Sequence, residues 1–278
     1  TWLQATSDKA PDQSCQMLHG LVSGSEWLGV PVRHLLKEAG VKPNGKWVIV
    51  EGSDAGTHAR SIPIEKLMDD AIIALYQNGE RLRPAQGYPM RLFVPGWEGN
   101  MNVKWVRRME VVEAPAYTKD ESRAYTETLP DGSIEQFSFY MGVKSVITTP
   151  SAGQKLPEQG YYELSGLAWS GFGKIKYIEV SDDGGKTWHK AQMHAPVLSK
   201  SLTRFTLPWH WNGNEVRLQS RAVDDFGNVQ PTHEEWKSNY KNGSYNHYNA
   251  IQTWQVNSDG GIKNVFKTIS EGGRDGKG

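Results

Sequence analysis

Apolar positions in the first half of the chain follow both strand and helix patterns. Residues 46–51 alternate as a half-buried strand does, residues 71–76 form a short apolar run, and the apolar residues of 32–39 recur at helical spacing. Gly40 gives that helix a stop, and Asn78-Gly79 is a strong signal for a tight hairpin turn. The pattern predicts an α+β domain of short strands and short helices.

The pattern changes from about Ser138 onward. Short apolar strands are separated there by turn signals such as Asp182-Asp183-Gly184-Gly185 and Asp224-Asp225-Phe226-Gly227. Strands that recur every ~8–12 residues are typical of a β-sandwich. We therefore predict an all-β second domain, with Trp169, Trp188 and Trp254 in its core.

The segment 87–108 has the most specific local pattern. A predicted strand at 91–94 is followed by a loop with Gly96 and Gly99, and a second strand is predicted at 103–106. Arg91 and Lys104 stand on either side of this loop, where an Arg fork and a Lys point charge could clamp an anion such as a phosphate. A hairpin with two solvated basic residues explains the same pattern.

Composition narrows the class of protein. The formal net charge is zero, which argues against nucleic acid or a membrane surface as the partner. No apolar run approaches the ~18 residues that span a bilayer. The chain has one cysteine, so a disulfide framework is excluded, and its 11 Trp residues leave a sugar-binding surface open.

The segment 89–108 reads PxRxxVPGxxGxxxVKWxRR and resembles the pterin-binding core of the sulfite oxidase family of molybdenum enzymes. The resemblance extends over most of the chain. Within the family it is most similar to the sulfane dehydrogenases of bacterial thiosulfate oxidation, through the segments 86–89, 96–100, 145–148, 202–205 and 251–254.

The resemblance implies a molybdopterin-binding domain of α+β fold followed by an immunoglobulin-like dimerisation domain. We expect the molybdopterin-binding domain over residues 1–113, a linker over 114–137, the immunoglobulin-like domain over 138–262 and a disordered tail over 263–278.

The same resemblance implies the site residues. Tyr125 corresponds to a tyrosine beside the metal that takes part in proton and electron transfer. His19, His58 and His247 are weaker candidates for positions near the site. The cofactor contacts that the resemblance implies fall on Asp54, Gln86, Arg91, Asn102, Val103 and Lys104.

The metal ligand is expected outside this sequence. The family holds molybdenum through the pterin dithiolene and one Cys thiolate, but Cys15 lies too close to Trp27 to match that cysteine. Counting back places the ligand before Thr1, so we expect an N-terminally truncated chain without the metal thiolate. Cys15 is then a buried small apolar residue or a bystander thiol.

The function implied is molybdenum-dependent oxidation of protein-bound sulfane sulfur, with electrons passed to a c-type cytochrome in the periplasm by a homodimer. A sulfite dehydrogenase of the same family is the nearest alternative. A different class, a non-enzymatic β-sandwich adhesion or carbohydrate-binding protein, is suggested by Trp209, Trp211 and Trp236 if these side chains are exposed.

Overall fold

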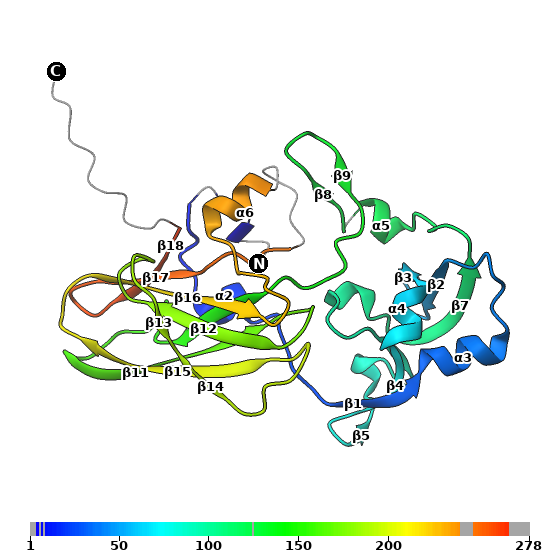
Figure 1. The fold of residues 1–278 in the computed structure, drawn as a ribbon, viewed down its shortest axis with the longest axis horizontal. Helices are drawn as coiled ribbons and strands as arrows, with labels where there is room; N and C mark the ends of the chain where they lie inside the picture. The colour runs from blue at the N-terminus through cyan, green and yellow to red at the C-terminus, as the bar shows by residue number, and fades with distance from the viewer. Residues whose placement is uncertain (1–3, 6, 8, 124, 240–246, 267–278) are drawn as a thin grey trace. The chain divides into compact units, whose positions relative to one another are not determined.

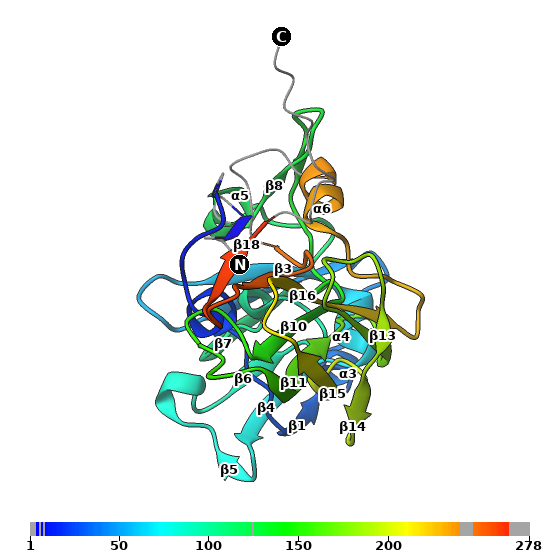
Figure 2. The same ribbon diagram turned by 90° about the vertical axis from the view of Figure 1, so that its left-hand side faces the viewer.

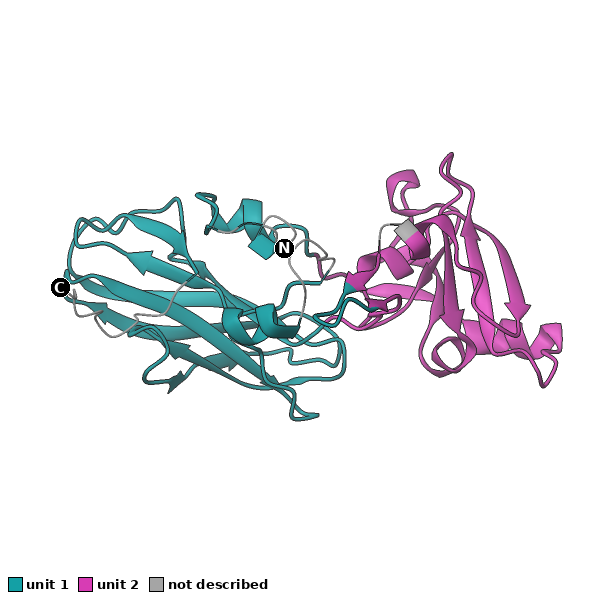
Figure 3. Ribbon diagram, turned by 90° about the horizontal axis from the view of Figure 1, so that it is seen from above, with its two compact units in different colours: residues 1–22, 128–133, 142–278 teal, residues 23–127, 134–141 magenta. Residues whose placement is uncertain are grey.

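A computed structural model describes residues 4–5, 7, 9–123, 125–239 and 247–266 of the chain. The chain divides into two compact units (Figure 3). Unit 1 comprises Thr1–Val22, Thr128–Ser133 and Gly142–Gly278, and unit 2 comprises Ser23–Glu127 and Ile134–Met141. Each unit has its own hydrophobic core.

Unit 2 contains two small antiparallel sheets (Figure 1). The first has the order β1 (Trp27–Pro31), β4 (Ile72–Gln77), β5 (Glu80–Arg81), with β6 (Arg91–Phe93) also paired to β4. The second has the order β3 (Ala59–Pro63), β2 (Trp47–Gly52), β7 (Val106–Val112). The helical segments are α3 (Val32–Ala39), α4 (Ile64–Asp69), α5 (Lys119–Arg123) and the 3₁₀ turns η1 (Pro84–Gln86) and η2 (Gly99–Met101).

The apolar pattern explains these elements. Val48 and Val50 of β2 point to one face and are fully buried in the core of unit 2, together with Leu36 of α3. Gly40 has φ of 70°, so α3 ends in the left-handed conformation that the glycine permits. Strand β4 pairs with β5 across Asn78-Gly79. The α+β class and these elements are confirmed.

The predicted second strand of the glycine loop begins later than expected. We predicted it from Val103, but β7 begins at Val106. Trp105 has φ of 51°, a left-handed conformation that no regular strand contains. Val103 still accepts a hydrogen bond from the backbone N–H of Leu92 (2.8 Å), so the loop stays fastened to β6.

Unit 1 is a β-sandwich, as predicted. One sheet has the order β10 (Lys144–Thr149), β11 (Gly160–Trp169), β15 (Thr203–Trp211), β14 (Gln192–His194), and the other β13 (His189–Lys190), β12 (Ile175–Ser181), β16 (Val216–Asp224), β17 (Thr253–Val256), β18 (Ile262–Val265). All neighbouring strands are antiparallel. Leu164 and Phe205 of the first sheet share a core with Ile178 and Leu218 of the second. Unit 1 also contains α2 (Cys15–His19) and α6 (His233–Asn239). The remaining elements of the chain are the paired strands β8 (Glu127–Thr128) and β9 (Ile134–Glu135), and β9 belongs to unit 2.

The tryptophans of the sandwich differ in burial from two expectations. Trp254 is fully buried in the core as predicted, and Trp169 packs against that core partly buried. Trp188 is not part of the core, and its ring centroid lies 4.3 Å from the guanidinium carbon of Arg221. Trp209, Trp211 and Trp236 are only 6%, 3% and 2% exposed. The prediction that these three tryptophans are exposed, which suggested a sugar-binding protein, is therefore wrong.

Both ends of the described chain pack on the sandwich. We assigned residues 1–22 to the molybdopterin-binding domain, but the structure groups them with unit 1, because Cys15 and Leu18 are buried in the sandwich core and Gln4 bonds to Asn264 of β18. Residues 263–265, which we placed in the disordered tail, instead belong to β18, labelled in Figure 2, and β18 pairs with β17. Residues 267–278 of that tail lie outside the described residues.

Lys144 at the start of β10 is buried without an acidic partner in the described part of the chain. Its side chain is 3% exposed, donates to the carbonyl of Tyr248 (2.6 Å) and lies 5.1 Å from the Tyr248 ring centroid. Burial lowers the pKa of Lys144 from 10.5 to about 7, and nearby Cys15 opposes the shift.

Lys144 should make stability depend on pH. Between pH 7 and 10.5 the unfolded chain binds a proton at Lys144 that the folded chain does not, so the free energy of unfolding rises with pH. One such proton gives a slope of at most about 1.4 kcal/mol per pH unit. Burial raises the pKa of Cys15 from 9.0 to about 11, and this has the opposite effect above pH 9. Urea unfolding between pH 7 and 9 should therefore show a rise that Lys144→Met removes. Equal slopes in the two proteins would contradict the assignment.

Candidate functional site

Arg91 is the first residue of β6, and its side chain forms hydrogen bonds with two backbone carbonyls. Its Nη1 donates to the carbonyl of Gln86 (3.1 Å) and its Nη2 to that of Asn102 (3.0 Å). The guanidinium also lies 4.9 Å from the ring centroid of Trp27, which stacks on Phe93. The arginine fork is thereby fixed in orientation at the start of the glycine loop.

The charge of Arg91 has no acidic partner among the described residues. The residue is 8% exposed, no carboxylate of the described residues forms an ion pair with it, and its buried Nε has no hydrogen-bond partner there. Burial lowers the pKa of Arg91 to about 10, so it is charged at neutral pH. A buried cation with a spare donor suits a bound anion such as a phosphate.

Gly87 brings the two basic residues to one place. A Cβ at residue 87 would lie 3.1 Å from the Cβ atoms of both Arg91 and Lys104, and φ at Gly87 is 112°. Only glycine combines that conformation with such a close approach. The Lys104 ammonium donates to the carbonyl of Ala85 (2.9 Å) at the turn η1, next to Gln86. The structure thus places Arg91, Gln86 and Lys104 around Gly87.

Asn102 and Val103 contribute backbone groups to this region. The Asn102 side chain accepts from the N–H of Val94 (2.7 Å) and donates to the carbonyl of Glu98 (3.0 Å), so it braces the glycine loop. Val103 is 1% exposed in the core of unit 2. The charged side-chain donors at the site therefore come from Arg91 and Lys104.

Asp54 lies at the end of β2, beside a surface cavity of about 420 Å³. One carboxylate oxygen, Oδ1, accepts from the backbone N–H of His58 (3.1 Å). The cavity is lined by Ser53, Asp54, Tyr88, Pro89, Trp105 and Val106. The lining of the cavity thus includes Asp54 and residues of the segment 87–108, which also carries Arg91 and Lys104. Sequence reasoning missed Tyr88 and Trp105, because nothing in the local pattern distinguishes a cavity-lining aromatic from a surface one.

Tyr125 follows α5 and is half-buried. Its ring lies over the Arg60 guanidinium, 5.1 Å from the guanidinium carbon to the centroid. Burial lowers the pKa of Arg60, and the nearby carboxylate of Glu121 opposes this shift. Sequence reasoning did not single out Arg60 or Glu121.

The three candidate histidines do not belong to the same unit. His58 belongs to unit 2 and contacts Asp120 and the carbonyl of Asn100 (2.8 Å each). His19 and His247 belong to unit 1. Burial lowers the pKa of His19, which keeps that ring neutral.

Cys15 has the environment of a structural residue. It is 8% exposed in the sandwich core, its sulfur lies 3.8 Å from the carbonyl of Ile147, and burial raises its pKa to about 11. Among the described residues no group of three or more His, Cys, Asp or Glu side chains could hold a metal ion. A protonated, buried thiol is a poor ligand for molybdenum.

Cys15→Ser should leave molybdenum content and most activity of the holoenzyme unchanged. The change should instead lower the midpoint of thermal unfolding slightly, because a hydroxyl replaces a buried apolar sulfur. Metal analysis and a thermal scan of both proteins test this. Loss of molybdenum with an unchanged unfolding midpoint would show that Cys15 is a metal ligand.

Comparison with known proteins agrees with the geometry. The profile of the oxidoreductase molybdopterin binding domain matches residues 4–119, and that of the Mo-co oxidoreductase dimerisation domain matches residues 135–253. The first range includes residues that pack on the sandwich in the structure.

Solved and curated proteins are similar to this chain over most of its length. The crystal structure of the sulfane dehydrogenase SoxCD from Paracoccus pantotrophus is 47% identical, with a TM-score of 0.90 over 93% of this chain and 67% of that chain. The mitochondrial sulfite oxidase of Drosophila melanogaster is 30% identical over 84% of this chain and 46% of that protein. Nitrate reductase [NADH] 2 of Phaseolus vulgaris is 31% identical over 77% of this chain and 28% of that protein. The chain thus spans less than half the length of the latter two.

Proposed function

The chain belongs to the sulfite oxidase family of molybdopterin oxidoreductases, and on that premise we propose that it oxidises protein-bound sulfane sulfur. The supporting observation is the 47% identity to a sulfane dehydrogenase along 93% of the chain. Oxidation of sulfite is the second candidate, because a sulfite oxidase is also among its relatives.

The cofactor of this family is the molybdenum cofactor, and the residues around Gly87 fit its phosphate. Arg91 and Lys104 would hold the phosphate by charge, with Gln86 as a neutral donor and the backbone of Asn102 and Val103 beside them. Asp54 would accept N–H groups of the pterin at the other side of the cavity. When bound, the cofactor supplies the two-electron redox chemistry.

Tyr125 is the residue that we assign to proton transfer. A phenol hydroxyl can donate or accept a proton, provided that its ring is held in one orientation. The Arg60 guanidinium over the ring supplies such a restraint.

We propose that electrons leave to a c-type cytochrome, and the similarity to a sulfane dehydrogenase supports this acceptor. The dimerisation domain supports a homodimer, and we propose a periplasmic location. No helix among the described residues is long and apolar enough to cross a membrane.

A substrate comparison tests the proposal. The holoenzyme is mixed with oxidised cytochrome c and either a carrier protein bearing a cysteine persulfide or sulfite, and haem reduction is followed spectroscopically. Faster reduction with the persulfide supports a sulfane dehydrogenase, and reduction by sulfite alone supports the second candidate. Reduction by neither substrate contradicts both.

A further inference from the structure

We propose that Arg60 is a positioning residue for Tyr125, holding the phenol ring from its face so that the hydroxyl meets the substrate in one orientation. This inference rests on the proposed function of Tyr125. It concerns a buried arginine on β3 outside the cofactor contacts.

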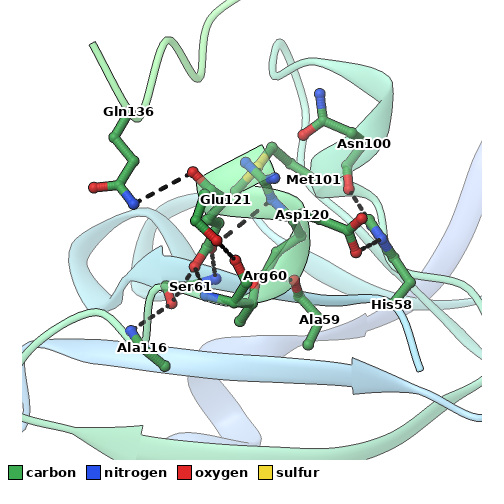
Figure 4. A network of polar contacts seen from close by, with 12 residues as sticks. His58, Ala59, Arg60, Ser61, Asn100, Met101, Ala116, Asp120, Glu121 and Gln136 are labelled. Carbon is green, nitrogen blue, oxygen red and sulfur yellow. Dashed lines mark hydrogen bonds and ion pairs between the residues drawn. The ribbon is translucent and has the colours of Figure 1, made fainter. Parts of the chain in front are cut away.

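The helix before Tyr125 is anchored on β3 through Glu121. The Glu121 side chain is fully buried and accepts from the backbone N–H of Ser61, from the Ser61 hydroxyl (3.1 Å) and from the N–H of Thr118 (3.1 Å) (Figure 4). The Thr118 hydroxyl donates to the carbonyl of Ala59 (2.9 Å). These donors stabilise a buried carboxylate and fix α5 against the strand that carries Arg60.

A second contact ties the same helix to the glycine loop. Asp120 lies 2.8 Å from Nδ1 of His58, and Nε2 of His58 lies 2.8 Å from the carbonyl of Asn100 in η2 (Figure 4). The backbone N–H of Tyr125 donates to the carbonyl of Asp120 (3.1 Å). The position of Tyr125 is therefore coupled to the loop that follows Arg91.

Arg60 fills the space between these anchors without forming a tight ion pair. It is 2% exposed, its Nε donates to the sulfur of Met101 (3.1 Å), and its distance to the Glu121 carboxylate is 3.9 Å. That distance exceeds a hydrogen bond, although Arg and carboxylate commonly form two short bonds. The buried Nη1 has no hydrogen-bond partner among the described residues. The guanidinium is thus held by the Met101 sulfur, a long ion pair and the Tyr125 ring, and not by a bidentate salt bridge.

The arrangement predicts a defect in turnover. Without the guanidinium the Tyr125 ring loses its restraint, so the hydroxyl is correctly oriented in a smaller fraction of the bound complexes. Substrate binding and cofactor retention should not change. Arg60→Met should lower kcat about 10- to 30-fold, the range expected from loss of a desolvated cation–π contact. KM and pterin content should stay near those of the wild type.

Two further variants test whether the loss of kcat is specific to the charge and position of Arg60. Arg60→Lys keeps the cation and should recover part of the lost kcat. Arg221→Met is the matched control, since Arg221 also covers an aromatic ring, that of Trp188, but lies in the sandwich. It should leave kcat unchanged.

A readout independent of the cofactor tests the positioning itself. In protein labelled with fluorotyrosine, the ¹⁹F resonance missing from Tyr125→Phe identifies Tyr125. Arg60→Met should move that resonance toward the position of free fluorotyrosine. If Arg60→Met does not fold, Arg60→Lys provides the same test with a smaller displacement.

Each outcome has one meaning. Reduced kcat with a displaced resonance and full pterin supports the positioning role. Wild-type kcat or an unmoved resonance in the Arg60 variants overturns it, and so does loss of pterin in Arg60→Met. If Tyr125→Phe itself has wild-type kcat, the proposed role of Tyr125 fails instead.

Discussion

Tyr125→Phe should slow turnover of the holoenzyme by about 10²–10⁴-fold, the usual contribution of a positioned acid or base. The substitution removes only the hydroxyl and keeps the ring that lies over Arg60. Cofactor binding should therefore survive. Steady-state kinetics together with pterin analysis of the same sample measure the two effects separately.

The matched control for Tyr125 is Tyr117→Phe. Tyr117 precedes the same helix and is 66% exposed. It should keep wild-type kcat. Loss of pterin in Tyr125→Phe would mean that Tyr125 is a structural residue, and an unchanged kcat would remove it from the mechanism.

Arg91→Met should deplete the protein of pterin. A charge-assisted hydrogen bond to a phosphate contributes about 1.5–3 kcal/mol, so its loss weakens retention of the cofactor about 10- to 150-fold. Lys104→Met should also lower the pterin content, but by less than Arg91→Met does, because Lys104 is more exposed than Arg91. Pterin released from the purified proteins is measured by fluorescence after oxidation.

Arg83→Met serves as the control for charge in general. Arg83 lies in the same loop region, but its side chain pairs with Glu80 at 76% exposure. It should retain full pterin. Equal pterin in wild type, Arg91→Met and Lys104→Met would eliminate the phosphate clamp.

Sequence reasoning succeeded where local chemistry determines the structure. Gly40 and Asn78-Gly79 force a helix end and a hairpin whatever surrounds them, and both were predicted. The alternation of 46–51 likewise fixes which side of β2 is buried. The positions of Arg91 and Lys104 beside one loop followed from such local signals.

Contacts between distant segments were not predictable in the same way. Gln4, Cys15 and Leu18 are buried against the sandwich through contacts with distant residues, such as that of Gln4 with Asn264, which no local pattern encodes. Trp209 and Trp211 alternate with polar residues, which places both on one face of a strand but does not say whether a second sheet covers that face; they lie on the inner face of β15. Arg60 reads as an ordinary strand residue until Glu121 and Tyr125 are brought to it by the fold.

If this chain binds the molybdenum cofactor, Arg91 should help to hold it, because Arg91, Gln86 and Lys104 lie around Gly87. The direct measurement is the molybdenum and pterin content of the holoenzyme, purified from a host that makes the cofactor, alongside Arg91→Met prepared identically. We expect molybdenum and pterin in equal amounts in the wild type, and both depleted in Arg91→Met. A folded wild-type protein with neither molybdenum nor pterin would contradict cofactor binding by this chain.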